Sequence, residues 1–407
     1  MRDIIFLNSH PIQYFAPLYK FLNEQGVTTK AWYCSDSSVK GSFDKEFGKN
    51  VKWDIPLLEG YENTFFKNNS LTPSHEKGFF GLVNFGAIKE LFKIKKSVIV
   101  VHGWNYFTHL SILLLGKLKG HTICLRCEMP QSQEVLKTGW KQAIKHVALK
   151  YIVFPRVDYF LYIGAQNNLF YKSYKIADER LVFCPYSVDD RRFRQEKARL
   201  QESIPTIKQN LGIPADGKVI LYSGKYTSKK RPMDVLEAFA LLKEPSCWLV
   251  MVGEGELRKE MEYFIKRNQL KQVILTGFIN QSAIPEYYAI SDVFVMCSTI
   301  GETWGLSANE AMNFDLPVII SDLTGCAQDL VKNGINGYIF KTGNVAELCT
   351  RIKDVLMEKK LSWAIPSQSI VNKYSYSSIK DNIQVIADDN GVVNSQPQPN
   401  VLSKQLN

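Results

Sequence analysis

Two glutamates frame a glycine-containing turn in the segment GETWGLSANEAMN. Glu302 and Glu310 are separated by seven residues. Between them, Gly305, Leu306 and Ser307 are expected to form a turn, which is followed by helix-favouring residues. The first backbone N–H groups of a helix have no acceptor within the helix and attract phosphate. The two carboxylates can then bind hydroxyl groups on either side of that phosphate, which is the chemistry of a nucleotide sugar.

A simpler arrangement fits part of the same segment. Ser307 and Glu310 have the S-x-x-E spacing of a capping box, in which the two side chains satisfy backbone N–H groups at a helix start. This alternative needs no ligand.

A second group of charged residues lies in the loop GKYTSKKRP, after a strand-like run over residues 219–223. Lys225 follows Gly224 directly, and Lys230 lies five residues further on. Two ammonium groups on one short loop can hold a diphosphate and stabilise the charge that develops as a nucleoside diphosphate departs. Because three basic residues are consecutive here, a solvated basic loop is the alternative.

Strand-like and helix-like segments alternate along the chain, which predicts parallel sheets covered on both faces. The strand-like runs are residues 3–8, 97–101, 122–125, 159–163, 219–223, 248–252, 273–276, 293–296 and 317–321. The expected helices include residues 110–118, 140–153, 233–243, 257–268 and 284–290. The predicted fold class is α/β, with two Rossmann-like doubly wound domains facing each other across a cleft.

A chain of 407 residues is expected to form two domains. The predicted parts are an N-terminal domain over 1–193, a linker over 194–206, a C-terminal domain over 207–375, a helix over 376–390 that packs back on the N-terminal domain, and a disordered tail over 391–407.

The composition, with 45% hydrophobic and 22% charged residues, is that of a globular protein. No apolar run approaches the roughly 20 residues that span a bilayer, and no secretory signal is expected in the first residues. The eight cysteines have no framework spacing. The pair Cys124 and Cys127 lacks partners for a zinc site, so burial is expected. These features predict a cytoplasmic, reduced protein.

The net charge of +10 is concentrated in the first half of the chain. Residues 1–190 carry 24 Lys and Arg against 17 Asp and Glu, and the remainder carry 26 against 23. This excess suits an anionic acceptor or membrane surface, and no nucleic-acid-binding motif is present. The basic helix over residues 140–153 is expected to be a domain helix with a solvated face. Contact with an anionic membrane at the inner face of the cell membrane is the alternative, favoured by a lipid-linked acceptor.

Four blocks of the second half resemble the C-terminal domain of family-four glycosyltransferases, which are retaining enzymes of the GT-B fold. They are GKYTSKKRPMDVLEAF, LVMVGEGELR, VILTGFINQSAIPEYYAISDVFVMCS and GETWGLSANEAMNFDLPVIISD. Their order and spacing match over roughly residues 219–345. The resemblance implies a nucleoside-diphosphate-sugar co-substrate and no other cofactor. The chain has no D-x-D segment, so a metal-independent site is expected.

The resemblance also implies roles for single residues. Lys225, in place of the usual arginine, and Lys230 would hold the donor diphosphate. Glu302 would contact the transferred sugar, and Glu310 the ribose hydroxyls. The catalytic set is Glu302, Lys230 and Lys225. The other implied substrate-binding residues of this half are Glu310, Gly305, Leu306, Ser307, Gly224, Gly253 and, where the family's backbone meets the nucleobase, Phe278 and Ile279.

The N-terminal half resembles the family's acceptor domain more weakly. His10, in HPIQYFAP, and His102, at the end of a strand-like run, are the candidate acceptor-side residues. Many family members carry a histidine at the end of a later strand, where this chain reads Arg126-Cys127-Glu128. No catalytic base is therefore predicted.

The predicted function is retaining sugar transfer to an acceptor hydroxyl in bacterial surface polysaccharide or glycolipid assembly. The expected partners are a nucleotide-sugar donor and a glycan or lipid-linked acceptor. Two alternatives are a non-hydrolysing nucleotide-sugar epimerase, which needs further carboxylates and histidines, and a non-catalytic nucleotide-sugar-binding protein. Donor hydrolysis without acceptor separates the three.

Overall fold

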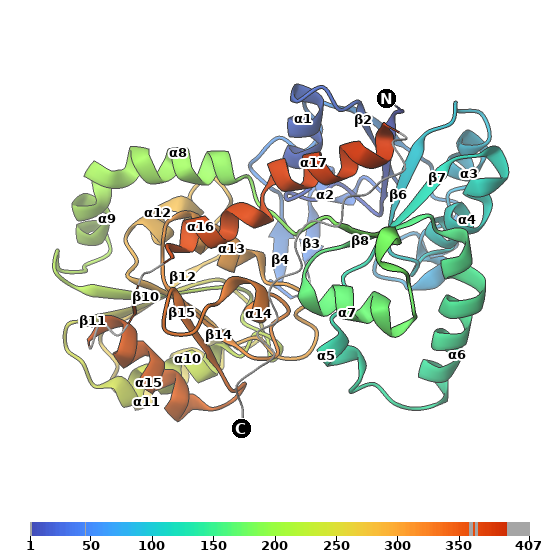
Figure 1. Ribbon diagram of the computed structural model, residues 1–407. Helices are drawn as coiled ribbons and strands as arrows, with labels where there is room; N and C mark the ends of the chain where they lie inside the picture. The colour runs from blue at the N-terminus through green and yellow to red at the C-terminus, as the bar shows by residue number, and fades with distance from the viewer. Residues whose placement is uncertain (1, 45, 358–360, 363–364, 389–407) are drawn as a thin grey trace. The chain divides into compact units, whose positions relative to one another are not determined.

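The structure is a computed structural model that describes residues 2–44, 46–357, 361–362 and 365–388. Contacts divide the chain into two units, each built on a parallel sheet (Figure 1). Unit 1 comprises Met1–Ser37, Leu57–Pro185 and Tyr376–Asn407. Unit 2 comprises Ser38–Pro56 and Tyr186–Ser375.

The sheet of unit 1 has seven parallel strands in the order β5-β2-β1-β6-β7-β8-β9. They are β1 Ile4–Asn8, β2 Thr29–Tyr33, β5 Glu62–Phe65, β6 Val98–His102, β7 Thr122–Arg126, β8 Tyr159–Tyr162 and β9 Leu181–Phe183. The central strands are continuous apolar runs, and all of β1 is buried, because helices cover both faces. The strand order reverses between β1 and β6, so the loops after these two strands diverge.

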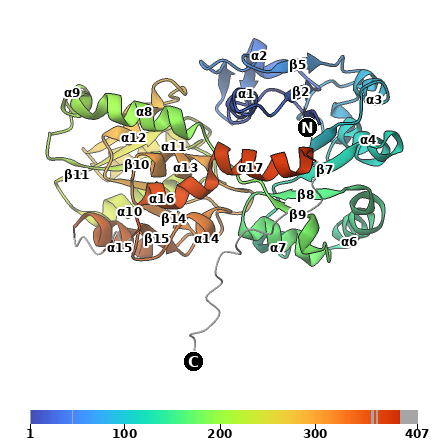
Figure 2. The ribbon, with the colours of Figure 1, turned by 45° about the horizontal axis from the view of Figure 1, so that its top comes forward.

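The helices of unit 1 are α1 Ala16–Glu24, α3 Phe85–Leu91, α4 Phe107–Leu115, α5 Gln131–Glu134, α6 Trp140–Ala148, α7 Ala165–Ser173 and α17 Tyr376–Ala387. Shorter turns are η1 Phe79–Gly81, η2 Gly116–Lys119, η3 Leu149–Val153, η4 Phe154–Arg156 and η5 Asp178–Arg180. The last helix, α17, packs against α1 and β9 (Figure 2). Among the described residues, none of the helices combines the length and apolar character needed to cross a membrane.

The sheet of unit 2 has six parallel strands in the order β12-β11-β10-β13-β14-β15. They are β10 Lys218–Ser223, β11 Cys247–Val252, β12 Val273–Gly277, β13 Val293–Met296, β14 Val318–Ser321 and β15 Gly337–Phe340. In chain order this is the 3-2-1-4-5-6 arrangement of the doubly wound dinucleotide-binding fold. The switch in direction falls between β10 and β13, which pair directly.

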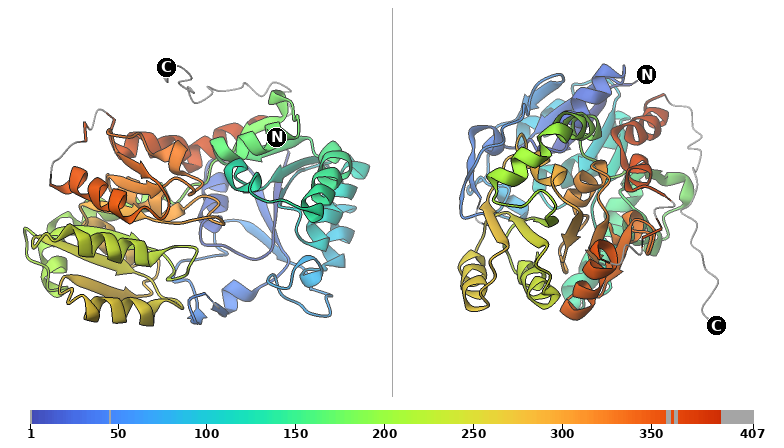
Figure 3. Two further views of the ribbon diagram at one scale, coloured as in Figure 1. Left: turned by 90° about the horizontal axis from the view of Figure 1, so that it is seen from below. Right: turned by 90° about the vertical axis from the view of Figure 1, so that its left-hand side faces the viewer.

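The helices of unit 2 are α8 Asp190–Leu200, α9 Ile204–Asn210, α10 Pro232–Leu242, α11 Arg258–Arg267, α12 Ile284–Ala289, α13 Leu306–Asn313, α14 Ala327–Leu330, α15 Val345–Leu356 and α16 Ser367–Val371, with the turns η6 Gln201–Ser203 and η7 Asn372–Tyr374. Three of them, α15, α10 and α11, lie side by side across one face of the sheet (Figure 3). Their apolar sides form one core with β10, β11 and β13.

A short segment from early in the sequence also belongs to unit 2. It contains most of α2 Ser37–Lys40 and an antiparallel hairpin of β3 Ser42–Asp44 and β4 Lys49–Val51. The segment connects two elements of unit 1, β2 and β5, yet its contacts are with unit 2. This assignment was not expected from the sequence.

Residues 194–206 were predicted to be a linker. The structure shows instead that this stretch is helical and part of unit 2. The side chain of Asp189 caps α8 by accepting from the backbone N–H of Arg192, and Phe193 and Leu200 are buried. The division between the units falls after Pro185 rather than after residue 193. The expected tail over 391–407 lies outside the described residues.

Three strands of unit 1 were missed in the sequence. β2 and β5 are joined by an ion pair in which Lys30 Nζ lies 2.8 Å from Glu62 Oε2, and such charged positions hide an alternating strand pattern. β9 has only three residues. The helix expected over residues 140–153 changes at Leu149 into the π-helical turn η3. All eight cysteines are free and buried, including Cys124 and Cys127.

Candidate functional site

The candidate site in unit 2 lies at the switch point of its sheet. Because β10 and β13 are neighbours, the loops after them leave the same edge of the sheet and diverge. A backbone hydrogen bond of 2.9 Å from Thr299 N to Lys229 O joins the two loops. The loop after β10 carries Lys225 and Lys230, and the loop after β13 leads through Glu302 to α13.

Lys230 and Glu302 form an ion pair at this edge. The Lys230 ammonium donates to Oε2 of Glu302, and the Ser298 hydroxyl lies 3.3 Å from the same oxygen. The two charged side chains are only 20% and 11% exposed, so they interact in a medium less polar than water. The structure therefore brings together a cation and a carboxylate that lie 72 residues apart in the chain.

A buried tyrosine fixes the lysine-bearing loop. The Tyr222 hydroxyl, on β10, donates to the carbonyl of Lys225 at 3.0 Å and lies 3.5 Å from that of Lys230. Burial holds the pKa of the Tyr222 phenol well above its ordinary value, so the group stays protonated and remains a donor. Sequence reasoning missed this residue, although a tyrosine near the end of an otherwise aliphatic buried strand is a visible signal.

Helix α13 begins directly after Gly305. Gly305 has φ 108°, and a Cβ added to it would lie 2.6 Å from the sulfur of Met296, so only glycine fits. No side chain caps the helix start. The first N–H groups, those of Leu306 and Ser307, have no acceptor within the helix. The binding of a phosphate by these N–H groups stays a prediction.

The capping-box alternative is wrong. Ser307 lies inside α13 rather than before it, and Glu310 is bonded elsewhere. The Tyr288 hydroxyl, on α12, donates to Oε2 of Glu310 at 2.7 Å. Glu310 is only 2% exposed, so its carboxylate is held in place by a buried neighbour. Tyr288 is a second positioning residue that sequence reasoning missed.

Lys225 does not join Lys230 and Glu302. Its ammonium instead donates to Asp44 at 2.9 and 3.1 Å and to Glu46 at 2.7 Å, in the segment before β4. Phe278, after β12, is partly buried against the aromatic rings of Phe47 and Trp53. Ile279 next to it is also partly buried.

The two glycines after β10 and β11 have a packing role. The N–H of Gly224 donates to the carbonyl of Val252 at 3.0 Å. A Cβ added to Gly253, which has φ 153°, would lie 1.9 Å from the carbonyl oxygen of Gly224. The backbones of the two loops are therefore too close for any side chain at position 253.

In unit 1, His10 and His102 both lie at the switch point, after β1 and at the end of β6. Burial, with His75 at a ring distance of 4.3 Å, lowers the pKa of His10 to about 4. Burial, followed by the charge of Arg126, also holds the pKa of His102 well below its ordinary value. Both imidazoles are therefore neutral at pH 7 and can accept one hydrogen bond each.

Arg126, at the end of β7, begins the stretch Arg126-Cys127-Glu128 that the resemblance sets against a histidine of many family members. Its side chain is buried and donates to the carbonyls of Cys184 at 2.8 Å and Pro185 at 3.3 Å. These bonds attach the end of β7 to the chain after β9, within unit 1.

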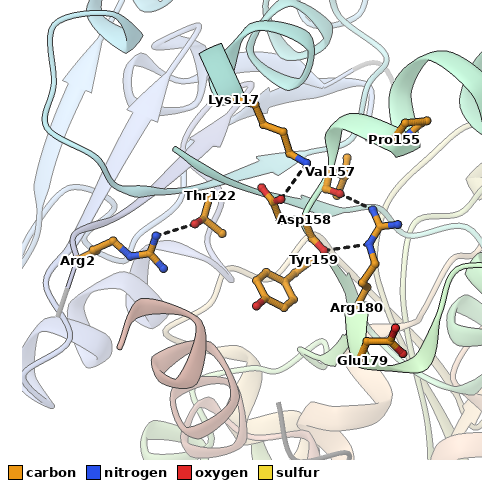
Figure 4. A pocket seen from close by; sticks show the side chains of 9 residues that line it. All are labelled: Arg2, Lys117, Thr122, Pro155, Val157, Asp158, Tyr159, Glu179 and Arg180. Atoms are coloured by element: carbon orange, nitrogen blue, oxygen red, sulfur yellow. Dashed lines mark hydrogen bonds and ion pairs between the residues drawn. The ribbon is translucent and has the colours of Figure 1, made fainter. Parts of the chain in front are cut away.

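A hollow of about 520 Å³ lies at the amino ends of the strands in the sheet of unit 1 (Figure 4). It is lined by the first residues of β7 and β8, so it is remote from His102 within the unit. Its cations already have partners: Lys117 is 2.9 Å from Asp158, and Arg180 donates to backbone carbonyls. Because these cations are already paired within the protein, we do not assign a ligand to the hollow.

Residues 203–369 match the family described as glycosyl transferases group 1. A UDP-Gal:alpha-D-GlcNAc-diphosphoundecaprenol alpha-1,3-galactosyltransferase of Escherichia coli is 30% identical over 202 residues, covering 48% of this chain and 49% of that protein. An alpha-monoglucosyldiacylglycerol synthase of Acholeplasma laidlawii is 30% identical over 142 residues, covering 34% and 35%. The chain spans about half the length, or less, of these curated relatives.

Solved structures are similar over nearly the whole chain. Alr3699/HepE of Anabaena, in complex with UDP and glucose, has a TM-score of 0.69 at 17% identity. The match covers 96% of this chain and 100% of the HepE chain. WaaG, a glycosyltransferase involved in lipopolysaccharide biosynthesis, has a TM-score of 0.63 at 15% identity, covering 95% and 100%. The predicted fold class, two Rossmann-like α/β domains of the GT-B type, is confirmed.

Proposed function

We propose that this protein transfers a sugar from a nucleoside-diphosphate sugar to an acceptor hydroxyl and retains the anomeric configuration. The observation that carries the proposal is the Lys230–Glu302 pair at the switch point of a dinucleotide-binding sheet. The uncapped start of α13 follows in the same loop. The family assignment of residues 203–369 supports the same reaction class.

Each charged group has a part in the proposed reaction. The bond between the anomeric carbon and the β-phosphate oxygen breaks, and negative charge grows on the diphosphate. Lys230 and the first N–H groups of α13 stabilise that charge. Glu302 binds hydroxyls of the transferred sugar, and Glu310, fixed by Tyr288, binds the ribose.

The acceptor oxygen attacks the anomeric carbon from the same face from which the diphosphate departs. Its proton passes to the departing phosphate oxygen, so no protein base is required. His10 and His102, both neutral, are proposed to bind acceptor hydroxyls in unit 1. The scheme uses no metal ion, because Lys230 and the N–H groups of α13 are proposed to stabilise the developing charge.

A glycan or lipid-linked acceptor is proposed, in bacterial surface polysaccharide or glycolipid assembly. Two relatives are named for transfer to a diphosphoundecaprenol-linked sugar and for synthesis of a glucosyldiacylglycerol. Both names include a lipid, which supports a proposed reaction at the inner face of a membrane.

A surface of unit 1 fits that location. Seven apolar side chains on and around α5 and α6 are 50–70% exposed: Val135, Leu136, Trp140, Ile144, Val147, Tyr151 and Ile152. A patch of this kind is unusual on a monomer. The same stretch carries Lys137, Lys141 and Lys150. Apolar side chains with lysines beside them are typical of a peripheral contact with an anionic membrane.

This contact is tested by sedimentation with vesicles of phosphatidylglycerol and phosphatidylcholine. Trp140→Ser with Ile144→Ser should lose binding and keep the fold, because both side chains are exposed. The control, Leu241→Ser with Tyr263→Ser, removes exposed apolar groups of unit 2 and should bind as the wild type does. Equal binding by both double variants would reject the membrane contact.

The proposed reaction is tested with a panel of UDP-, GDP- and ADP-sugars and a lipid-linked glycan acceptor. Transfer is followed by chromatography, and the product's anomeric configuration by NMR. Retention supports the proposal, whereas inversion contradicts it. Interconversion of two donor sugars would indicate the epimerase, and binding without turnover the non-catalytic alternative.

A further inference from the structure

The segment Ser38–Pro56, here called the strap, belongs to unit 2 although it is inserted between two strands of unit 1. It contains the hairpin of β3 and β4 and an acidic turn between them. In that turn, Oδ1 of Asp44 accepts from the backbone N–H groups of Glu46 at 2.9 Å and Phe47 at 3.0 Å. These two bonds hold the Asp44 carboxylate next to residues 46 and 47.

The acidic turn surrounds the ammonium of Lys225. Both oxygens of Asp44 and one of Glu46 lie within 3.1 Å of Lys225 Nζ, and the ring centre of Phe47 lies 4.6 Å from it. The hydrogen bond from Lys225 lowers the pKa of Glu46 below its ordinary value. Two carboxylates and an aromatic face therefore surround a lysine that the family resemblance assigns to the donor diphosphate.

The rest of the strap is attached to the chain after β12. The ring of Phe278 packs edge-on against Phe47 at 5.0 Å and lies 6.1 Å from Trp53. The side chain of Asn280 donates to the carbonyl of Lys52 at 2.8 Å, and the Ser282 hydroxyl and N–H donate to Asp54. None of these attachments except that of Phe47 involves the acidic turn.

The contacts at Lys225 are weak enough to exchange. The side chains of Asp44 and Glu46 are 29% and 52% exposed, and that of Lys225 is 24% exposed. Ion pairs with this exposure stabilise little. A diphosphate carries comparable charge, and it would gain hydrogen bonds from Lys230 and from α13 at the same time. A diphosphate can therefore displace the carboxylates from Lys225, while Asp54 still holds the strap to Ser282.

We propose that the strap is a competitor of the donor built into the chain, with Asp44 and Glu46 occupying the diphosphate position on Lys225 until a nucleotide sugar displaces them. This inference rests on the proposed function, because it takes the Lys225 position as part of the donor site. In the absence of donor, the strap pairs the charge of Lys225 with two carboxylates. It also makes donor binding release the turn of Asp44.

The test compares UDP binding, by isothermal titration calorimetry, to the wild type and to Asp44→Asn with Glu46→Gln. These substitutions remove both charges and keep hydrogen-bond acceptors, so the turn at Asp44 is retained. UDP affinity should rise about 2- to 30-fold, the range expected from losing two partly exposed competing ion pairs. The control, Glu24→Gln with Glu59→Gln, removes the same charge from exposed positions outside the strap and should change affinity little.

Release of the turn at Asp44 from Lys225 is measured with a nitroxide label at position 43. Phe43 is 58% exposed, and all eight natural cysteines are buried, so Phe43→Cys gives one reactive thiol. UDP should make the label more mobile. In Asp44→Asn with Glu46→Gln the label should already be mobile without UDP. Circular dichroism checks the fold, and Glu46→Gln alone provides a milder variant that leaves Asp44 intact.

The outcomes separate the two proposals. Tighter UDP binding in the neutralised variants, with a mobile label, supports competition by the strap. Unchanged or weaker UDP binding, with nucleotide still bound, overturns competition and shows that the carboxylates position Lys225 instead, while the donor site stands. If UDP, GDP and ADP bind neither the wild type nor the variants, the proposed function falls, and the role of the strap falls with it.

Discussion

Replacing Lys230 by methionine removes one ammonium group from the candidate donor site and keeps the length of the side chain. Lys230 is paired with Glu302, and their side chains are 20% and 11% exposed. Lys230→Met should therefore weaken UDP binding and slow transfer, because the charge of the diphosphate loses a partner in a partly buried place.

The size of both effects follows from this environment. A hydrogen bond to a charged group contributes about 1.5–3 kcal/mol, which corresponds to about 10- to 150-fold in UDP affinity. The effect on kcat should be larger, about 10²- to 10³-fold, because the charge on the leaving group grows in the transition state. Glu302 keeps the nearby Ser298 hydroxyl at 3.3 Å, so the loss of unfolding free energy should be limited to about 1–3 kcal/mol.

Affinity is measured by calorimetry with UDP, and stability by urea denaturation. The double variant Lys230→Met with Glu302→Gln should regain stability without regaining affinity, because it removes the uncompensated carboxylate as well. Lys229→Met, in the same loop, is the control for general charge and should bind UDP nearly as the wild type does. UDP affinity unchanged by Lys230→Met would refute the assignment of Lys230 to the diphosphate.

Three further predictions concern residues that position the site or report on burial. Gly305→Ala should lower the free energy of unfolding by about 1–3 kcal/mol in urea denaturation, since a Cβ would meet the sulfur of Met296 at 2.6 Å; unchanged stability would mean that the turn adapts. Tyr288→Phe should weaken UDP binding, measured by calorimetry, and should cost about 1–3 kcal/mol of unfolding free energy by removing the hydrogen bond to buried Glu310; an unaltered affinity would exclude Glu310 from the donor site. Burial lowers the pKa of His109 to about 4, so the unfolded chain binds more protons below pH 6.5 and stability falls as pH falls. Between about pH 7.5 and pH 5 this histidine should account for roughly 2 kcal/mol, and His109→Gln should flatten that pH dependence in urea denaturation.

The sequence was informative wherever a strand is buried on both faces. β10, β11 and β13 are aliphatic runs bounded by glycine or polar residues, and their predicted and observed bounds differ by one residue at most. The same argument failed for β2 and β5, where Lys30 and Glu62 pair across the sheet edge. A charged residue whose partner lies on a neighbouring strand is mistaken for a loop residue when the neighbouring strand is not known.

Part of the candidate site was indicated by the family resemblance, which put Lys230, Glu302 and Lys225 in one set. The structure brings Lys230 and Glu302 together because they lie in the loops after the neighbouring strands β10 and β13. Lys225 is instead paired with Asp44 and Glu46. Tyr222 and Tyr288 were not found, because each acts through a hydroxyl whose partner is fixed only by packing.

The strap could not be derived from the sequence. Asp44 and Lys225 lie 181 residues apart, and no periodicity links the hairpin of β3 and β4 to the second half of the chain. Its attachment depends on single contacts with Phe278, Asn280 and Ser282, each made by a different residue type. Such contacts carry no repeating pattern, so only the three-dimensional structure reveals them.

The most direct test of the central claim is a crystal structure of the protein with a bound nucleoside-diphosphate sugar. We expect the diphosphate to lie at the start of α13, within hydrogen-bond distance of Lys230 Nζ, with Lys225 turned from Asp44 towards it. A diphosphate bound elsewhere, with the Lys230–Glu302 pair and the start of α13 both unoccupied, would contradict it.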